Sequence, residues 1–87
     1  MGITKTSKRA STGTRYRDDK FLKKLGARFK KIRTAKGYSI DRIHLESGIS
    51  RATASHIERG MVDPQASTLK RLAETIGVRF AELMDID

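Results

Sequence analysis

The side chains best suited to chemistry in this sequence are a run of lysines and arginines. Every charged residue from position 20 to position 36 is basic, whereas acids slightly outnumber bases from Gly60 onward. The run comprises Lys20, Lys23, Lys24, Arg28, Lys30, Lys31, Arg33 and Lys36. A surface of this charge binds a phosphate polymer by releasing counterions, without reading its sequence. The alternative is a solvated face that only keeps the protein soluble.

Side chains for catalysis or metal binding are sparse. There is no cysteine, which excludes disulfides and thiolate metal sites, and neither His44 nor His56 has an acid placed to orient it. We find no glycine-rich phosphate loop and no pair of carboxylates at catalytic spacing on one helix. We therefore expect a binding protein rather than an enzyme, with no cofactor and no metal.

Length and composition favour a single small domain. A chain of 87 residues leaves little spare stability for an enclosed catalytic pocket. No apolar run is long enough to span a bilayer, and the basic N-terminus is not followed by the apolar stretch of a signal peptide. Together with the absence of cysteine, this indicates a cytoplasmic protein.

The first 18 residues form a separate region. They combine serines, threonines and basic residues, and their sizeable apolar groups are Ile3 and Tyr16. Such a segment cannot stay folded alone, so we interpret residues 1–18 as a flexible basic arm that could follow DNA. The alternative is an inert tail or a remnant of cloning.

From Asp19 the pattern becomes helical and predicts an all-α domain over residues 19–87. Its first helix, from Asp19 to Gly37, has an apolar stripe. That stripe consists of Leu22, Leu25, Phe29 and Ile32. A second, short helix is expected between the N-cap Ser39 and Gly48, a glycine suited to a left-handed turn.

Three further helices follow. Ser50 is expected to cap a third helix that ends near Arg59 and buries Ala54 and Ile57. Ser67 is a candidate cap for a fourth helix ended by Gly77, and residues 79–84 predict a last turn. The fourth helix has the apolar stripe Leu69, Leu72, Ala73 and Ile76, and the last turn is expected to bring Phe80 and Leu83 to the core. The fold expected is a compact bundle of five short helices.

The stretch from Ser39 to Gly60 joins two short helices by a tight glycine turn, and the second has a thin apolar side. This arrangement lets a helix project from its domain into a groove. Its residues, SIDRIHLESGISRATASHIERG, resemble the helix-turn-helix of the phage-repressor (Cro-like, Xre-type) family of transcription regulators. The likeness extends from Leu25 to Leu83, and it implies a lambda-repressor-like fold and a nucleoid-associated, sequence-specific regulator of transcription.

The resemblance implies that the exposed side of the third helix contacts base edges. The positions concerned are Arg51, Ala52, Ser55 and His56. Arg51 can donate two hydrogen bonds to the O6 and N7 of guanine, and Ala52 can pack on a thymine methyl. For Arg51 the alternative is a solvated surface arginine, and for His56 it is a phosphate contact or solvent alone.

The family pattern also implies contacts with the DNA backbone and a structural ion pair. Phosphates are expected at the N-termini of the second and third helices. The residues expected to assist are Lys36, Ser39, Ser50, Thr53, Arg59 and the backbone of the Met61 loop. Arg33 and Glu58 are expected to pair and tie the third helix to the scaffold; the alternative is a surface pair of little energy.

Two positions depart from the family pattern. Ile40 replaces the glutamine that commonly reaches a phosphate, which puts that contact in doubt. His44 stands where the family keeps a small alanine, and Ala54 stands where it keeps isoleucine or valine. We hypothesise that His44 fills the space left by Ala54. Leu45 is then expected to face outward.

A single motif buries little surface, so we expect a homodimer on a palindromic operator. The apolar C-terminal residues are the expected self-contact: Phe80, Leu83, Met84 and Ile86. The alternative is that they only close the domain.

A second interpretation of the whole chain is a protein-interaction or antitoxin-type module that works through this C-terminal face. A third is a nonspecific coat or membrane-surface protein that uses the basic helix and tail.

Overall fold

The computed structural model describes residues 16–86, which form five α-helices joined by short connections. The helices are α1 (Asp19–Ala35), α2 (Ile40–Ser47), α3 (Arg51–Glu58), α4 (Ala66–Ile76) and α5 (Phe80–Leu83). No strand occurs within this part of the chain, so the prediction of an all-α fold is confirmed. Most of the expected basic arm, residues 1–15, lies outside the described residues.

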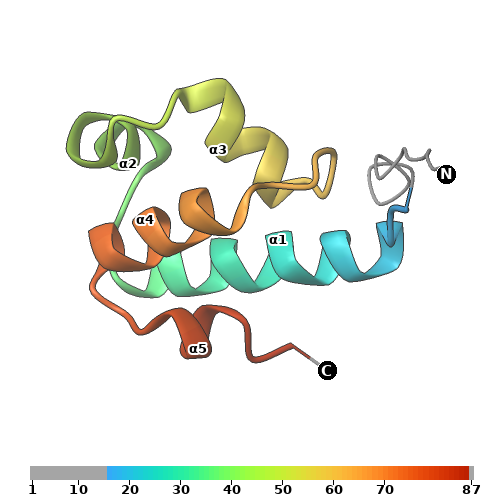
Figure 1. The fold of residues 1–87 in the computed structure, drawn as a ribbon. Coiled ribbons are helices and arrows are strands. Elements are labelled where there is room, and N and C mark those ends of the chain that lie inside the picture. Colours follow the sequence, from blue (N-terminus) through green and yellow to red (C-terminus); the bar gives the residue numbers. More distant parts are fainter. Residues whose placement is uncertain (1–15, 87) are drawn as a thin grey trace, which may run out of the picture.

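The longest helix, α1, organises the bundle (Figure 1). It packs against α3 on one side and α5 on the other, while α2 packs against α3 and α4. Helix α4 also contacts α5, which closes the chain back on α1. Within residues 16–86 no helix is both long and apolar enough to cross a membrane.

The apolar stripes predicted from the sequence are the core. All four stripe residues of α1 and all four of α4 are buried, together with Ala54 and Ile57 of α3. The largest of them, Phe29, has no exposed surface. Each buried Leu, Ile or Phe side chain contributes about 1.5–3 kcal/mol relative to exposure. The core therefore holds the five helices together without covalent links.

The caps of α2 and α3 are those expected from the sequence. The Ser39 hydroxyl accepts a hydrogen bond from the Arg42 amide at 3.0 Å, and the Ser50 hydroxyl accepts one from the Thr53 amide at 3.0 Å. Each bond satisfies an amide that has no partner within its helix. The two caps thereby fix where α2 and α3 begin.

Two helix ends differ from the prediction. The last helical residue of α1 is Ala35, because Lys36 already serves as the C-cap before the left-handed Gly37. Helix α4 begins at Ala66 instead of after Ser67, because extended Gln65 occupies the cap position without a side-chain hydrogen bond. Ser67 therefore lies inside α4 and caps nothing.

The C-terminal turn buries fewer residues than expected. Leu83 is fully buried, but the Phe80 residue keeps 41% of its surface exposed, so its predicted place in the core is wrong. Helix α5 has a single turn and offers one side chain fully to the core. Val78, Met84 and Ile86, which flank this turn in the sequence, are partly buried and pack against the core.

Candidate nucleic-acid interface

The turn between α2 and α3 is fixed by Ser47 and Gly48. Gly48 has a φ of 81°, a left-handed conformation that glycine adopts without strain. The buried Ser47 hydroxyl donates to the Ile43 carbonyl at 2.6 Å and accepts from the Ile49 amide at 3.0 Å. One side chain thus holds both sides of the turn, which sets the angle at which α3 leaves α2.

Arg71 of α4 secures the same turn from outside it. Its Nε donates to the Ser47 carbonyl at 3.1 Å, at the end of α2 where carbonyls lack helical partners. A cation is favourable at this end of a helix dipole. This role of Arg71 could not be predicted from the sequence, since no local pattern links residues so far apart in the chain.

The C-terminal end of α3 is tied to α1 by an ion pair. The Arg33 Nε contacts one oxygen of the Glu58 carboxylate, and its Nη2 donates to the other oxygen at 3.1 Å. Nη1 donates to the Tyr38 carbonyl at 2.6 Å. Both side chains are about nine-tenths buried, with exposed fractions of 11% and 9%. The ion pair expected from the family resemblance is therefore present, and it is not a surface pair.

Gly26 allows α1 and α3 to approach closely beside this ion pair. A Cβ at position 26 would lie 2.3 Å from the Ile57 carbonyl oxygen and 2.4 Å from that of Glu58. Only glycine fits between these backbones. Gly26 was not among the residues expected to matter, although a glycine inside a helical pattern is a known sign of close packing.

The N-terminal turn of α3 is the exposed part of this anchored helix. Arg51, Ala52 and Thr53 are exposed, while Ser55 and His56 are half-buried. Within the described residues, the backbone N–H groups of Arg51 and Ala52 donate to no protein acceptor. Unpaired amides at the positive end of a helix dipole suit an anion such as a DNA phosphate.

Arg51 is held by an acid from the neighbouring helix. Its Nε contacts Oδ1 of Asp41, in the first turn of α2. Both side chains are more than half exposed, at 55% for Arg51 and 66% for Asp41. No spacing pattern in the sequence relates Asp41 to Arg51, because the two residues lie on different helices.

A second exposed pair on α2 has both of its members on that helix. Arg42 lies 3.8 Å above the centre of the Tyr38 ring and donates to Glu46 at 2.7 Å. This hydrogen bond to Glu46 raises the pKa of Arg42 above its ordinary value. Beside it Leu45 is 74% exposed, as expected from the sequence.

The side chains expected to contact phosphates are on the surface. Lys36, Ser39, Ser50, Thr53 and Arg59 are all exposed. They surround the starts of α2 and α3, apart from Arg59, which follows the end of α3. All five are therefore accessible, and their contacts with phosphates stay a prediction.

The backbone of Met61 is not available as expected. Its N–H donates to the His56 carbonyl at 2.9 Å, and its carbonyl accepts from Arg17 Nη2 at 2.8 Å. Both polar groups of Met61 itself are therefore occupied, and a phosphate contact by the rest of the Met61 loop backbone stays a prediction. Arg17 belongs to the end of the predicted arm, which here lies against the loop after α3.

The two departures from the family pattern have distinct positions. Ile40 is half-buried against the core, so it replaces a polar contact with packing. His44 is half-buried and its Nδ1 lies 2.9 Å from the Ile49 carbonyl, an acceptor, so Nδ1 carries the proton. Ala54 is fully buried. That the His44 side chain fills the volume left by the small Ala54 stays a prediction.

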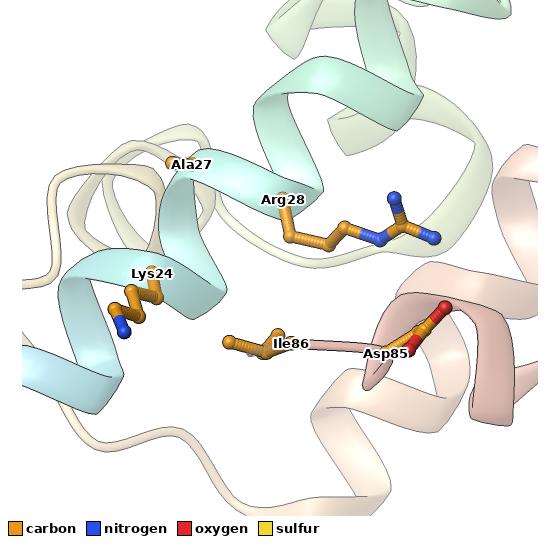
Figure 2. A pocket seen from close by; sticks show the side chains of 5 residues that line it. All are labelled: Lys24, Ala27, Arg28, Asp85 and Ile86. Carbon is orange, nitrogen blue, oxygen red and sulfur yellow. The ribbon is translucent and has the colours of Figure 1, made fainter.

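The expected self-contact is at the C-terminal face. Leu83 has no exposed surface and cannot take part, which corrects that assignment; Phe80 is exposed, and Met84 and Ile86 are half-buried. Figure 2 shows a shallow groove at Ile86, with this side chain next to the α1 side chains Lys24 and Arg28. No residue of α2 or α3 lines this groove, so it is separate from the exposed end of α3.

Comparison with known proteins places the chain in a family. The model of the helix-turn-helix family HTH_3 matches residues 29–83, more than half of the chain. The chain belongs to the HTH_3 family. This match covers α2, the glycine turn and α3, and so confirms the resemblance found in the sequence.

Two relatives of this chain are named as regulators of transcription. The HTH-type transcriptional regulator SlrR of Bacillus subtilis is 38% identical over 64 residues, which are 72% of this chain and 42% of SlrR. The uncharacterised HTH-type transcriptional regulator y4dJ of Sinorhizobium fredii is 36% identical over 62 residues, 71% of this chain and 80% of y4dJ. The chain thus spans less than half the length of SlrR.

Solved structures share the fold. The restriction-modification controller protein C.AhdI of Aeromonas hydrophila has a TM-score of 0.69 and 32% identity, covering 71% of this chain and 94% of that protein. An HTH_3 family transcriptional regulator of Vibrio cholerae has a TM-score of 0.72 and 28% identity, covering 77% of this chain and 38% of that protein. The helical arrangement of this HTH_3 chain is therefore that of known regulators.

Proposed function

We propose that this HTH_3 protein is a transcriptional regulator that binds double-stranded DNA by inserting α3 into the major groove. One observation carries the proposal: the first turn of α3 exposes Arg51, Ala52 and unpaired backbone amides. The helix that carries them is anchored at both ends, by the Ser47 turn and by the Arg33–Glu58 pair. A rigid helix with an exposed polar tip is what direct reading of base edges requires.

The side chains of α3 define which bases it can read. The guanidinium of Arg51 can bond guanine O6 and N7, and the methyl group of Ala52 can contact thymine. Ser55 and His56, one turn further, can donate or accept but are half-buried, so they reach less far. We expect Arg51 to contribute most of the discrimination.

Phosphate contacts supply affinity and set the register of α3. The exposed N-termini of α2 and α3 offer amides, with Ser39, Ser50 and Thr53 beside them, and Lys36 and Arg59 add positive charge. Such contacts carry no sequence information and weaken as salt rises. The HTH_3 domain therefore binds any DNA weakly and its operator tightly.

The proposed assembly is a homodimer on a palindromic site. Phe80 is exposed, and Met84 and Ile86 offer half-buried apolar surface beside it. A two-fold contact through this face would double the DNA contacts and place half-sites about ten base pairs apart. Such a protein acts on the nucleoid in the cytoplasm, by binding and not by catalysis. Repression through occupation of a promoter is the action we expect.

Selection of bound sites from random duplex DNA, using the full chain, tests this function. The selected site should bind at least about a thousandfold more tightly than scrambled DNA at physiological salt. Arg51→Ala should lower the preference at one base pair by about 1–3 kcal/mol. Arg79→Ala, at an exposed arginine between α4 and α5, should leave every base preference unchanged. Equal affinity for every duplex contradicts the proposal.

A further inference from the structure

The ion pair between Asp41 and Arg51 links the two helices of the helix-turn-helix at their exposed ends. Only Nε of the Arg51 guanidinium contacts the Asp41 carboxylate. Among the described residues, its two terminal nitrogens, Nη1 and Nη2, hold no hydrogen bond. The arginine is therefore held at one edge and open at the other.

Because Nε of Arg51 is occupied and Nη1 and Nη2 are not, the guanidinium can approach a base in one way only. A guanidinium can meet guanine through Nε and Nη2 or through Nη1 and Nη2, because each edge presents two parallel N–H groups. When the Asp41 carboxylate occupies Nε, the first edge is taken. The Nη1 and Nη2 edge is left for guanine O6 and N7.

Asp41 is placed independently of Arg51. It lies in the first turn of α2, where a carboxylate is favourable near the positive end of the dipole, and the Ser39 cap fixes that turn. The turn at Ser47 and Gly48 sets α2 against α3. The acid thus serves as a fixed point for a long side chain that would otherwise sample many rotamers.

We propose that Asp41 is a positioning residue for base recognition: it holds Nε of Arg51 so that Nη1 and Nη2 meet a guanine. The proposal rests on the proposed function, since it needs Arg51 to read a base. In free protein such an exposed pair contributes little to stability. Its effect appears on the DNA, where the pair loses water and a misdirected arginine loses a two-bond contact.

The matched control is the Arg42–Glu46 pair. Glu46 is also an exposed acid of α2 paired with an arginine, and its partner lies on the same helix instead of on α3. Asp41→Asn and Glu46→Gln remove the same charge, so both should strengthen binding to all DNA slightly. Only Asp41→Asn should change which base is preferred.

The experiment compares wild type, Asp41→Asn, Glu46→Gln, Arg51→Ala and the Asp41→Asn, Arg51→Ala double variant. The probes are the selected duplex and copies with each base pair changed in turn, measured by fluorescence anisotropy at one salt concentration. Asp41→Asn should reduce the guanine preference at the Arg51 base pair by about fivefold, and Glu46→Gln by less than about twofold. In the Arg51→Ala background, Asp41→Asn should have no further effect on this preference.

Three results would overturn the proposal. The first is an unchanged guanine preference in Asp41→Asn, and the second is equal loss in Asp41→Asn and Glu46→Gln, which indicates charge alone. The third is an unchanged preference in Arg51→Ala although wild type still selects a site, which leaves specific binding intact but removes Arg51 from it. Failure of wild type to select any site overturns the proposed function itself. Thermal unfolding of each variant separates these results from loss of fold.

Discussion

Gly26 of α1 lies directly against the Ile57 carbonyl of α3, in a contact too close for any side chain. A Cβ at position 26 would be 2.3 Å from that oxygen. Two helix backbones meet here, and neither can move without disturbing the core residues Leu25 or Ile57 on each side. The absence of one methyl group thus sets how α3 sits on its scaffold.

Gly26→Ala should therefore destabilise the protein, although alanine is normally the better residue in a helix by about 1 kcal/mol. Overpacking against backbone should cost about 2–3 kcal/mol. Urea unfolding followed by circular dichroism measures the change. Ala27→Gly, at the exposed next position, should cost only the propensity difference of about 1 kcal/mol. A stabilised Gly26→Ala variant would show that the helices are further apart than described.

Removal of Glu58 should be the most damaging single change near α3. Glu58→Ala leaves the Arg33 guanidinium about nine-tenths buried and without its carboxylate, at a cost of about 3–5 kcal/mol. That is a large part of the stability of a small domain, so much of the protein should unfold at moderate urea. Glu74→Gln is the control, because Glu74 and Lys70 form an exposed pair that contributes little to stability. Similar midpoints for both variants contradict this prediction.

Most helices could be predicted from the sequence because their signals are local. Ser39 and Ser50 bond amides three residues ahead, and Gly48 turns the chain where it stands. Apolar stripes are equally local, since residues three and four apart share a helix face. The single turn of α5 is too short for this rule to establish how deeply Phe80 is buried.

The anchors of the candidate site are long-range and mostly escaped prediction. Arg71 reaches the Ser47 carbonyl across a separation that no spacing rule covers. The same holds away from the site, where Arg28 of α1 reaches the Glu82 carbonyl of α5 at 2.9 Å. The pair of Arg33 and Glu58 was expected only because the sequence resembles a family. Spacing alone indicates what each helix buries but not which distant carbonyl its arginines meet.

The hypothesis that His44 fills the space left by Ala54 predicts that the stability losses of two substitutions do not add. His44→Ala removes partly buried volume and the hydrogen bond to the Ile49 carbonyl, and should cost about 1–2 kcal/mol. If His44 fills space beside the small Ala54, adding Ala54→Ile should recover part of this loss by restoring the volume. Free energies of unfolding for the two single variants and the double variant form the test. Losses that simply add would refute the exchange of sizes.

Lys36 should contribute affinity for DNA without specificity. It is the exposed C-cap of α1, close in sequence to the start of α2, where we propose a phosphate contact. Lys36→Ala should weaken binding about equally for operator and scrambled duplexes, and reduce the slope of log affinity against log salt by about 1. Titrations at several salt concentrations measure both quantities, with Arg79→Ala as the control for loss of one distant charge. A change in base preference would show instead that the Lys36 side chain reaches into a groove or that its loss moves α3 on the duplex.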